Sequence, residues 1–430
     1  MGKRHGFDST APLHIMFPTA RERTEPGAGA KYHARAMRPV RHVMSVVGAR
    51  PNFMKTAPVI AALRRHAPPI RHTLVHTGQH YDDSMSAIFL EELGVGAPDH
   101  LLNVGSGTHA VQTARVMERI EPILAAERPD LLLVPGDVNS TVAAALVAAK
   151  LGIPVGHIEA GLRSFDRTMP EEINRLLTDQ LSSLLFIHSP EARLNLLREG
   201  CDDQRIHDVG NTMIDTLVAM RPRIRALDVP ATRGLERGDY LVVTLHRPAL
   251  VDGPLLDRAV AALDSIAAGM RVVFPIHPRT AQEMQRRGLS FSNPRIELLE
   301  PLGYLEFVSL LEGSAAALTD SGGIQEETTY LGIPCFTLRD NTERPVTCDL
   351  GTNVLLGLAP ERILDVPAML PGLRSRPATV PPGWDGDAGP RLVAALESGV
   401  QECAGPAGLA ATIAPPRAWA AAPEQRLNTA

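Results

Sequence analysis

Polar side chains that can do acid–base or hydrogen-bond chemistry follow several apolar, strand-like segments of the chain. The segments cover residues 131–134, 153–158, 240–245, 271–276 and 315–319, and the polar residues after them are Asp137, Glu159, His246, His277 and Asp320. The carboxyl ends of parallel strands meet at one edge of an open α/β sheet, where ligands bind. One such residue alone would be explained as a helix cap or a satisfied loop group. Five in equivalent positions predict a shared ligand site.

A second pattern is suited to phosphate. Ser321, Gly322 and Gly323 begin an expected helix, and paired glycines let backbone N–H groups approach a phosphate closely. Glu327, one turn into this helix, could accept hydrogen bonds from two ribose hydroxyls. Arg344, in the segment Thr-Glu-Arg-Pro, supplies a further cation. The structural alternative for the two glycines is a tight turn.

The loop from Gly48 to Lys55 carries two cations, Arg50 and Lys55, and leads into an expected helix. Helix N-termini attract anions, and nearby cations strengthen such a site. Lys55 is one of four lysines in the chain, so its presence here departs from the Arg-rich composition. The functional interpretation is binding of a diphosphate or a sugar, and the structural one is a solvated loop.

Three carboxylates, Asp137, Glu159 and Glu171, are candidates for proton transfer together with His246. Asp137 could instead cap the following helix. A closing cleft could raise the pKa of Glu159 toward neutrality, unless Glu159 forms an ion pair with Arg163. Glu171 and Glu172 occupy the first turn of an expected helix and point in different directions, so at most one of them should face a substrate.

Composition excludes several classes of partner and cofactor. The net charge is −5 in 430 residues, without long runs of one sign, which argues against nucleic acid and anionic membranes. No apolar stretch reaches the roughly 18 residues of a membrane helix. Four cysteines without metal-ligand spacing favour a reducing, cytoplasmic location. Dinucleotide and ATP-binding glycine motifs are absent, so we expect no cofactor. Clusters of His and Asp that would complete a metal site are also absent, so we expect no metal.

Strand-like and helical segments alternate along most of the chain, which predicts an α/β fold with parallel sheets. The alternation pauses around 215–238, where we place a boundary between domains at 41–212 and 213–386. Residues 1–40 and 403–430 lack periodicity and are expected to be disordered, with Met37 or Met44 as an alternative start. A helix is expected at 387–402.

The motifs together resemble the non-hydrolysing UDP-N-acetylglucosamine 2-epimerase family, in the right order across residues 43–360. They read GARPNFMK, TGQH, PGDVNST, HIEAGLRS, PEEINR, VGN, LHRP, PIHP, TDSGGIQEE and RDNTERP. The resemblance implies the glycosyltransferase-B fold, in which two Rossmann-like domains face a central cleft and the C-terminal helix returns to the first domain. It also implies a homodimer.

Roles carry over at matching positions. The resemblance implies catalysis by Asp137, Glu159, Glu171 and His246, and substrate binding by the residues Arg50, Lys55, Phe307, Ser321, Gly322, Gly323, Glu327 and Arg344. We add His277 as a substrate-binding candidate because it follows a strand in the same way as His246. This chain departs from relatives at Pro248, at Leu302, where some carry Gln, and at Tyr81-Asp82-Asp83. The last departure argues against activation by the enzyme's own substrate.

The implied reaction is inversion at C2 of UDP-N-acetylglucosamine. UDP leaves C1, a base removes the C2 proton, and UDP adds back to a glycal with protonation on the other face. Four alternatives stay open: the same chemistry on a UDP-diacetamido uronic acid, a hydrolysing 2-epimerase, a silent sugar-nucleotide-binding regulator and a glycosyltransferase.

Overall fold

The computed structural model describes residues 37–78, 90–376 and 378–401, apart from the side chains of Arg50 and Gln401. The Tyr-Asp-Asp segment and the tail 403–430 lie outside these residues. Order begins before the predicted boundary at 41, because β1 (Met37–Arg38) pairs antiparallel with β15 (Val400–Gln401). No helix in the described residues is long and apolar enough to cross a membrane.

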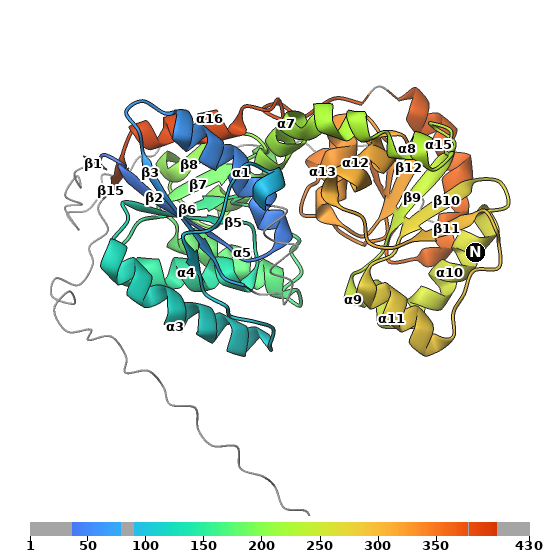
Figure 1. Ribbon diagram of the computed structural model, residues 1–430, viewed down its shortest axis with the longest axis horizontal. Coiled ribbons are helices and arrows are strands. Elements are labelled where there is room, and N and C mark those ends of the chain that lie inside the picture. Colours follow the sequence, from blue (N-terminus) through green and yellow to red (C-terminus); the bar gives the residue numbers. More distant parts are fainter. Residues whose placement is uncertain (1–36, 79–89, 377, 402–430) are drawn as a thin grey trace, which may run out of the picture. The chain divides into compact units, whose positions relative to one another are not determined.

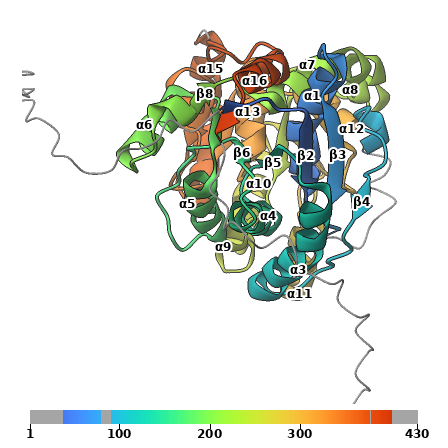
Figure 2. The same cartoon turned by 90° about the vertical axis from the view of Figure 1, so that its left-hand side faces the viewer.

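The first half of the chain builds a seven-stranded parallel sheet in the order β4-β3-β2-β5-β6-β7-β8. Figure 2 shows these strands running across the view from β8 to β4. Their bounds are β2 His42–Val47, β3 Arg71–His76, β4 His100–Leu101, β5 Leu131–Pro135, β6 Val155–Ile158, β7 Leu184–Ile187 and β8 Ile206–Asp208. The central strands are apolar and fully buried, as strands covered on both faces must be.

Helices cover both faces of this sheet (Figure 1). They are α1 Arg50–Arg65, α3 His109–Glu127, α4 Asn139–Lys150, α5 Pro170–Leu181, α6 Pro190–Arg198 and α16 Ala388–Glu397. Residues of α1 and α16 pack on Val43, Leu131 and Leu133. Residues of α3 and α4 pack on the opposite side chains, Met44 and Leu132 among them. This alternation along each strand gives the sheet a hydrophobic core on each face.

The second half builds a six-stranded parallel sheet in the order β11-β10-β9-β12-β13-β14. Its strands are β9 Tyr240–Thr244, β10 Arg271–Pro275, β11 Ile296–Leu299, β12 Ala316–Thr319, β13 Cys335–Thr337 and β14 Asn353–Leu355. Its helices are α8 Val229–Thr232, α9 Pro248–Val251, α10 Leu255–Ile266, α11 Pro278–Arg287, α12 Tyr304–Glu312, α13 Gly322–Leu331, α14 Val346–Asp349 and α15 Val366–Ser375. The predicted α/β fold of two Rossmann-like domains, as in glycosyltransferase-B proteins, is confirmed.

The stretch 215–238, where the predicted alternation of strands and helices pauses, is mostly helical. Helix α7 (Thr212–Leu227) continues through Pro222 and buries Met213, Ile214 and Leu217 at helical spacing. It packs against α1 and α16 as well as α12 and α13. One apolar cluster therefore contains residues from both halves.

Strand order reverses at two places, between β2 and β5 in the first sheet and between β9 and β12 in the second. Each reversal opens a crevice at the carboxyl ends of the strands. The loops that leave β5, β9 and β12 contain Asp137, His246 and Ser321. Lys55, which the sequence predicted in a loop after β2, lies instead in the second turn of α1, because the helix already begins at Arg50. The topology thus places the predicted chemistry at both switch points.

Candidate functional site

A cavity of about 590 Å³ is lined by these loops and by the starts of the helices that follow them. It brings together most of the predicted site residues: Lys55, Asp137, Glu171, His246, His277, Phe307, Ser321, Gly322, Gly323, Glu327 and Arg344. Glu159 does not line it, and the side chain of Arg50, at the start of α1, lies outside the described structure. The predicted convergence of strand ends is therefore found for Asp137, His246 and His277.

Helix α13 begins at the wall of the cavity, with Gly322 buried and Ser321 and Gly323 partly buried. Ser321 is its N-cap, and its first amides have no partner within the helix. A Cβ on Gly322 would come within 2.7 Å of Nη1 of Arg344, and a Cβ on Gly323 within 3.3 Å of the Met213 methyl group. Glycine here lets the Arg344 guanidinium lie directly against the helix start. Amides, helix dipole and guanidinium together form an anion site.

Arg344 is buried among three carboxylates. Its guanidinium lies 3.0 Å from Glu326, 3.5 Å from Glu343 and 3.7 Å from Glu159. Burial alone would lower the pKa of Arg344, but these carboxylates raise it above its usual range. Arg344 is therefore a permanent cation.

Glu159 lies beneath the cavity, where it contacts Lys55 and Arg344. Burial alone would raise the pKa of Glu159, but Lys55, Arg344 and His188 lower it to about 2. The predicted rise toward neutrality is wrong, and so is the predicted pair with Arg163. Arg163 pairs instead with the carboxylates of Asp179 and Glu199. Both expectations failed because Lys55 and Arg344, the partners of Glu159, are distant from it in sequence.

His246 is held by a carboxylate. Its Nδ1 lies 2.8 Å from Asp320, which also accepts the backbone N–H groups of His246 and Arg247 at 2.8 Å. Burial alone would raise the pKa of Asp320, but the hydrogen bond with His246 lowers it. Asp320 thus fixes the imidazole and leaves Nε2 for a ligand. The sequence placed Asp320 at a strand end, but the site residues inferred from it omitted Asp320.

His277 lies near His246, with ring centroids 5.5 Å apart. Its Nδ1 accepts the backbone N–H of Arg279 at 3.2 Å, so it also caps α11. Burial, followed by the neighbouring His246, lowers the pKa of His277.

The side chains of the two adjacent glutamates of α5 point in different directions, as predicted. Glu171 is half-buried and lines the cavity. Glu172 is buried, pairs with Arg175 at 2.7 Å and accepts the backbone N–H of Ser164 at 3.0 Å. Asp137 also pairs with Arg175, which the sequence analysis did not assign. The signal that could have found Arg175 is its place in the motif PEEINR, one turn after the acids.

The remaining lining is suited to a nucleoside. Glu327 is buried at the cavity wall, and the apolar side chains of Phe307, Leu302 and Met213 lie around the same space. Leu302, where some relatives have Gln, offers no side-chain hydrogen bond. An acid and an apolar surface beside an anion site fit a ribose and a base.

A three-residue cluster resembles a metal site, although the sequence predicted none. Ligand atoms of Glu159, His188 and Glu326 lie within 4.8 Å of one another. Lys55 already contacts Glu159, and Arg344 contacts both carboxylates. These two cations neutralise the carboxylates and repel a metal ion, so the donor set does not fit a divalent cation.

Comparison with known proteins gives consistent matches. A family model described as UDP-N-acetylglucosamine 2-epimerase matches residues 61–397. A UDP-N-acetylglucosamine 2-epimerase of Methanococcus maripaludis is 42% identical over 358 residues, covering 81% of this chain and 96% of that protein. A UDP-2,3-diacetamido-2,3-dideoxy-D-glucuronate 2-epimerase of Pseudomonas aeruginosa is 42% identical over 330 residues, covering 75% and 90%. The crystal structure of Methanocaldococcus jannaschii UDP-GlcNAc 2-epimerase in complex with UDP-GlcNAc and UDP matches with a TM-score of 0.76 at 41% identity, covering 83% of this chain and all of that one.

Proposed function

The chain belongs to the UDP-N-acetylglucosamine 2-epimerase family, and we infer from this and from the cavity that it interconverts UDP-N-acetylglucosamine and UDP-N-acetylmannosamine. The observation that carries the inference is one cavity in which an anion site at the start of α13 lies with three acid–base groups, Asp137, Glu171 and His246. The enzyme is then an isomerase that acts on a nucleotide sugar.

The diphosphate binds at the start of α13. Backbone amides of Gly322 and Gly323 and the guanidinium of Arg344 face this position, and Lys55 lines the same cavity. When the bond between C1 and the diphosphate oxygen breaks, UDP takes the electron pair and gains negative charge. Fixed cations and amides stabilise that charge without reorganising. Glu159, ionised beneath them, holds Lys55 and Arg344 in place.

Inversion at C2 requires a proton to leave one face and return to the other. The C2 hydrogen is not next to a carbonyl, so direct abstraction would be slow. Loss of UDP together with the C2 proton forms a C1–C2 double bond, and UDP adds back as C2 is reprotonated. Asp137, Glu171 and His246 are the candidate proton donors and acceptors that line the cavity. Closure around the glycal excludes water and prevents hydrolysis.

A second candidate substrate is a UDP-2,3-diacetamido uronic acid, because the Pseudomonas relative that acts on this sugar is as similar in identity as the archaeal ones. Incubation of the protein with each UDP-sugar, followed by chromatography of products, separates the candidates. Conversion of UDP-N-acetylglucosamine alone supports the main proposal. Conversion of the uronate alone would replace it, and free N-acetylmannosamine would indicate a hydrolysing enzyme.

We further propose that the protein is a homodimer, as the family resemblance suggests. We also propose that it is cytoplasmic, as the free cysteines Cys201, Cys335 and Cys348 suggest. Light scattering tests the assembly. A mass of roughly twice the 46.3 kDa chain supports the dimer, and a mass of one chain contradicts it.

A further inference from the structure

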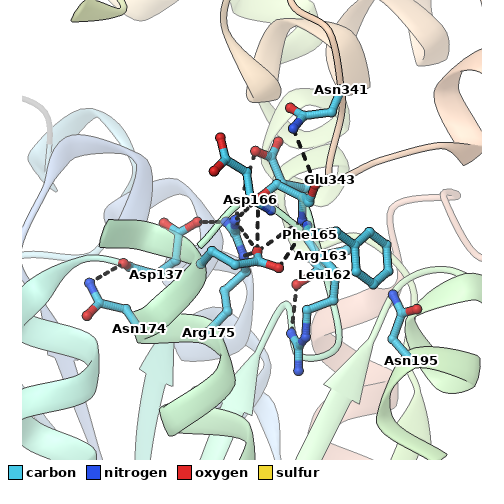
Figure 3. Close-up of polar contacts among 12 residues, drawn as sticks. Asp137, Leu162, Arg163, Phe165, Asp166, Asn174, Arg175, Asn195, Asn341 and Glu343 are labelled. Carbon is cyan, nitrogen blue, oxygen red and sulfur yellow. Dashed lines mark hydrogen bonds and ion pairs between the residues drawn. The ribbon is translucent and has the colours of Figure 1, made fainter. Parts of the chain in front are cut away.

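The guanidinium of Arg175 lies between two carboxylates with different surroundings. Arg175 is buried near the start of α5, with 3% of its side chain exposed. Its Nη1 donates to Asp137, which lines the cavity, while Nε and Nη2 donate to Glu172 at 3.0 and 2.7 Å (Figure 3). A planar guanidinium can hold two carboxylates in fixed directions at once, which a lysine ammonium does much less well.

Glu172 anchors one side of this arrangement to the backbone. Its carboxylate accepts the N–H groups of Ser164 and Phe165 at 3.0 and 2.9 Å, and the Ser164 hydroxyl at 3.1 Å. Phe165 adopts φ +59°, a conformation that is unusual for a bulky residue. Burial alone would raise the pKa of Glu172, but the Ser164 N–H and Arg175 lower it. The charged Glu172 carboxylate, itself held by these hydrogen bonds, therefore holds the guanidinium of Arg175 in place.

Glu343 connects Arg175 to the second half of the molecule. It lies 3.9 Å from Nη2 of Arg175, pairs with Arg339 at 2.5 Å and lies 3.5 Å from Nη1 of Arg344. Asn341, from the same loop, donates to the carbonyl of Ser164 at 3.3 Å (Figure 3). Charges of alternating sign thus run from Asp137 through Arg175 and Glu343 to Arg344. Their burial strengthens each attraction relative to water.

We propose that Arg175 is a positioning residue for the epimerisation: it orients the Asp137 carboxylate, and Glu343 makes that orientation depend on the loop that carries Arg344. The proposal rests on the proposed function, because it gives Asp137 a substrate and Arg344 a diphosphate. Arg175 itself lines the cavity, as Glu343 does, but its proposed role needs no bond to substrate. Its effect on turnover passes through Asp137.

The test is a pair of double-mutant cycles with UDP-N-acetylglucosamine. Arg175→Lys keeps the charge but loses the two-sided geometry, so we expect kcat to fall about 100-fold, with KM and the Kd for UDP within about threefold. In an Asp137→Asn background, Arg175→Lys should reduce the residual rate by less than about threefold, because the residue it acts through is already lost. Glu343→Gln should likewise reduce kcat less in the Arg175→Lys background than in the wild type.

The matched control is Arg163→Lys. Arg163 is also a buried arginine between two carboxylates, but it does not line the cavity. If Arg175 only stabilises the fold, both Lys variants should lose activity in proportion to their loss of thermal stability. That outcome would overturn the proposal. Wild-type kcat in Arg175→Lys would also overturn it, and so would losses of kcat from Arg175→Lys and Asp137→Asn that multiply independently in the double variant.

A crystal structure of Arg175→Lys gives a readout that needs no turnover. A displaced Asp137 carboxylate supports the proposal, and an unchanged one contradicts it. If the wild type binds UDP but does not epimerise UDP-N-acetylglucosamine, the proposed function fails, and this structural readout still decides the role of Arg175.

Discussion

Arg344 lies so close to Gly322 that a Cβ at position 322 would come within 2.7 Å of its Nη1 atom. The glycine is required here because of its neighbour, since its own φ is not positive. Gly322→Ala must therefore displace either the guanidinium or the start of α13. Both form the proposed diphosphate site, so the glycine at position 322 should be needed for binding UDP.

We predict that Gly322→Ala weakens UDP binding at least about tenfold, since a charged contact to phosphate contributes more than about 1.4 kcal/mol. Isothermal titration with UDP measures this change. Gly372→Ala is the matched control: it is also a glycine of a helix, and nothing lies within 4 Å of its added Cβ. Equal UDP affinity in both variants would exclude the proposed diphosphate position.

The Lys55–Glu159 pair predicts a pH-dependent contribution to stability. The pKa of Glu159 falls from its ordinary value near 4.5 to about 2 on folding. A lowered folded-state pKa stabilises the protein above pH 4.5, and this contribution is lost as the pH falls toward 2. We expect Glu159→Gln to reduce the free energy of unfolding by about 3 kcal/mol at pH 7, and by progressively less below pH 4.5. Urea unfolding of both proteins from pH 7 to pH 3 measures the difference, and a pH-independent difference would contradict the assignment.

The contact between Asp320 and His246 predicts a loss of turnover without loss of binding. Asp320→Asn can still accept a backbone N–H but presents an amide donor or a neutral oxygen to the imidazole, which disturbs its tautomer. We expect kcat to fall at least about 100-fold and the Kd for UDP to stay within about threefold. Asp264→Asn is a suitable control, because Asp264 also holds backbone N–H groups, those of Ser292 and Asn293, far along the chain from the site. Activity of Asp320→Asn near that of the control would show that turnover does not depend on the contact between Asp320 and His246.

Substitutions of the two adjacent glutamates of α5 should have different effects, one mainly on kcat and the other mainly on the free energy of unfolding. Glu171→Gln should lower kcat about 100-fold, because Glu171 lines the cavity, and change the free energy of unfolding by less than about 0.5 kcal/mol. Glu172→Gln should cost about 3 kcal/mol of stability, because it leaves Arg175 with a weaker buried partner. Steady-state kinetics and urea unfolding of both variants test this expectation, and wild-type kcat in Glu171→Gln would contradict the assignment of Glu171 to the reaction.

Local sequence patterns predicted the positions of most of the buried strands. Apolar runs that end in Gly or a polar residue correctly located β2, β5, β6, β9, β10 and β12, and their shared direction placed Asp137 and His246 at one cavity. The edge strands β8, β11 and β14 were not predicted, because β8 and β14 have only three residues each and β11 is largely not buried. Helix α7 was missed because Pro222 and several arginines obscured its buried apolar face.

Electrostatics could not be predicted in the same way. The pKa of Glu159 depends on Lys55, 104 residues earlier in the chain, and on Arg344 in the second sheet domain. The contact between Arg175 and Glu343 likewise joins two segments that no periodicity relates. These partners are set by the tertiary fold, so the residue types were predictable and their charge states were not.

The most direct test of the account is proton NMR of the purified protein with UDP-N-acetylglucosamine in D₂O. Epimerisation through loss and return of the C2 proton predicts that UDP-N-acetylmannosamine appears with deuterium at C2. Epimer that retains its C2 hydrogen, or a UDP-binding protein that leaves the substrate unchanged, would contradict the central claim.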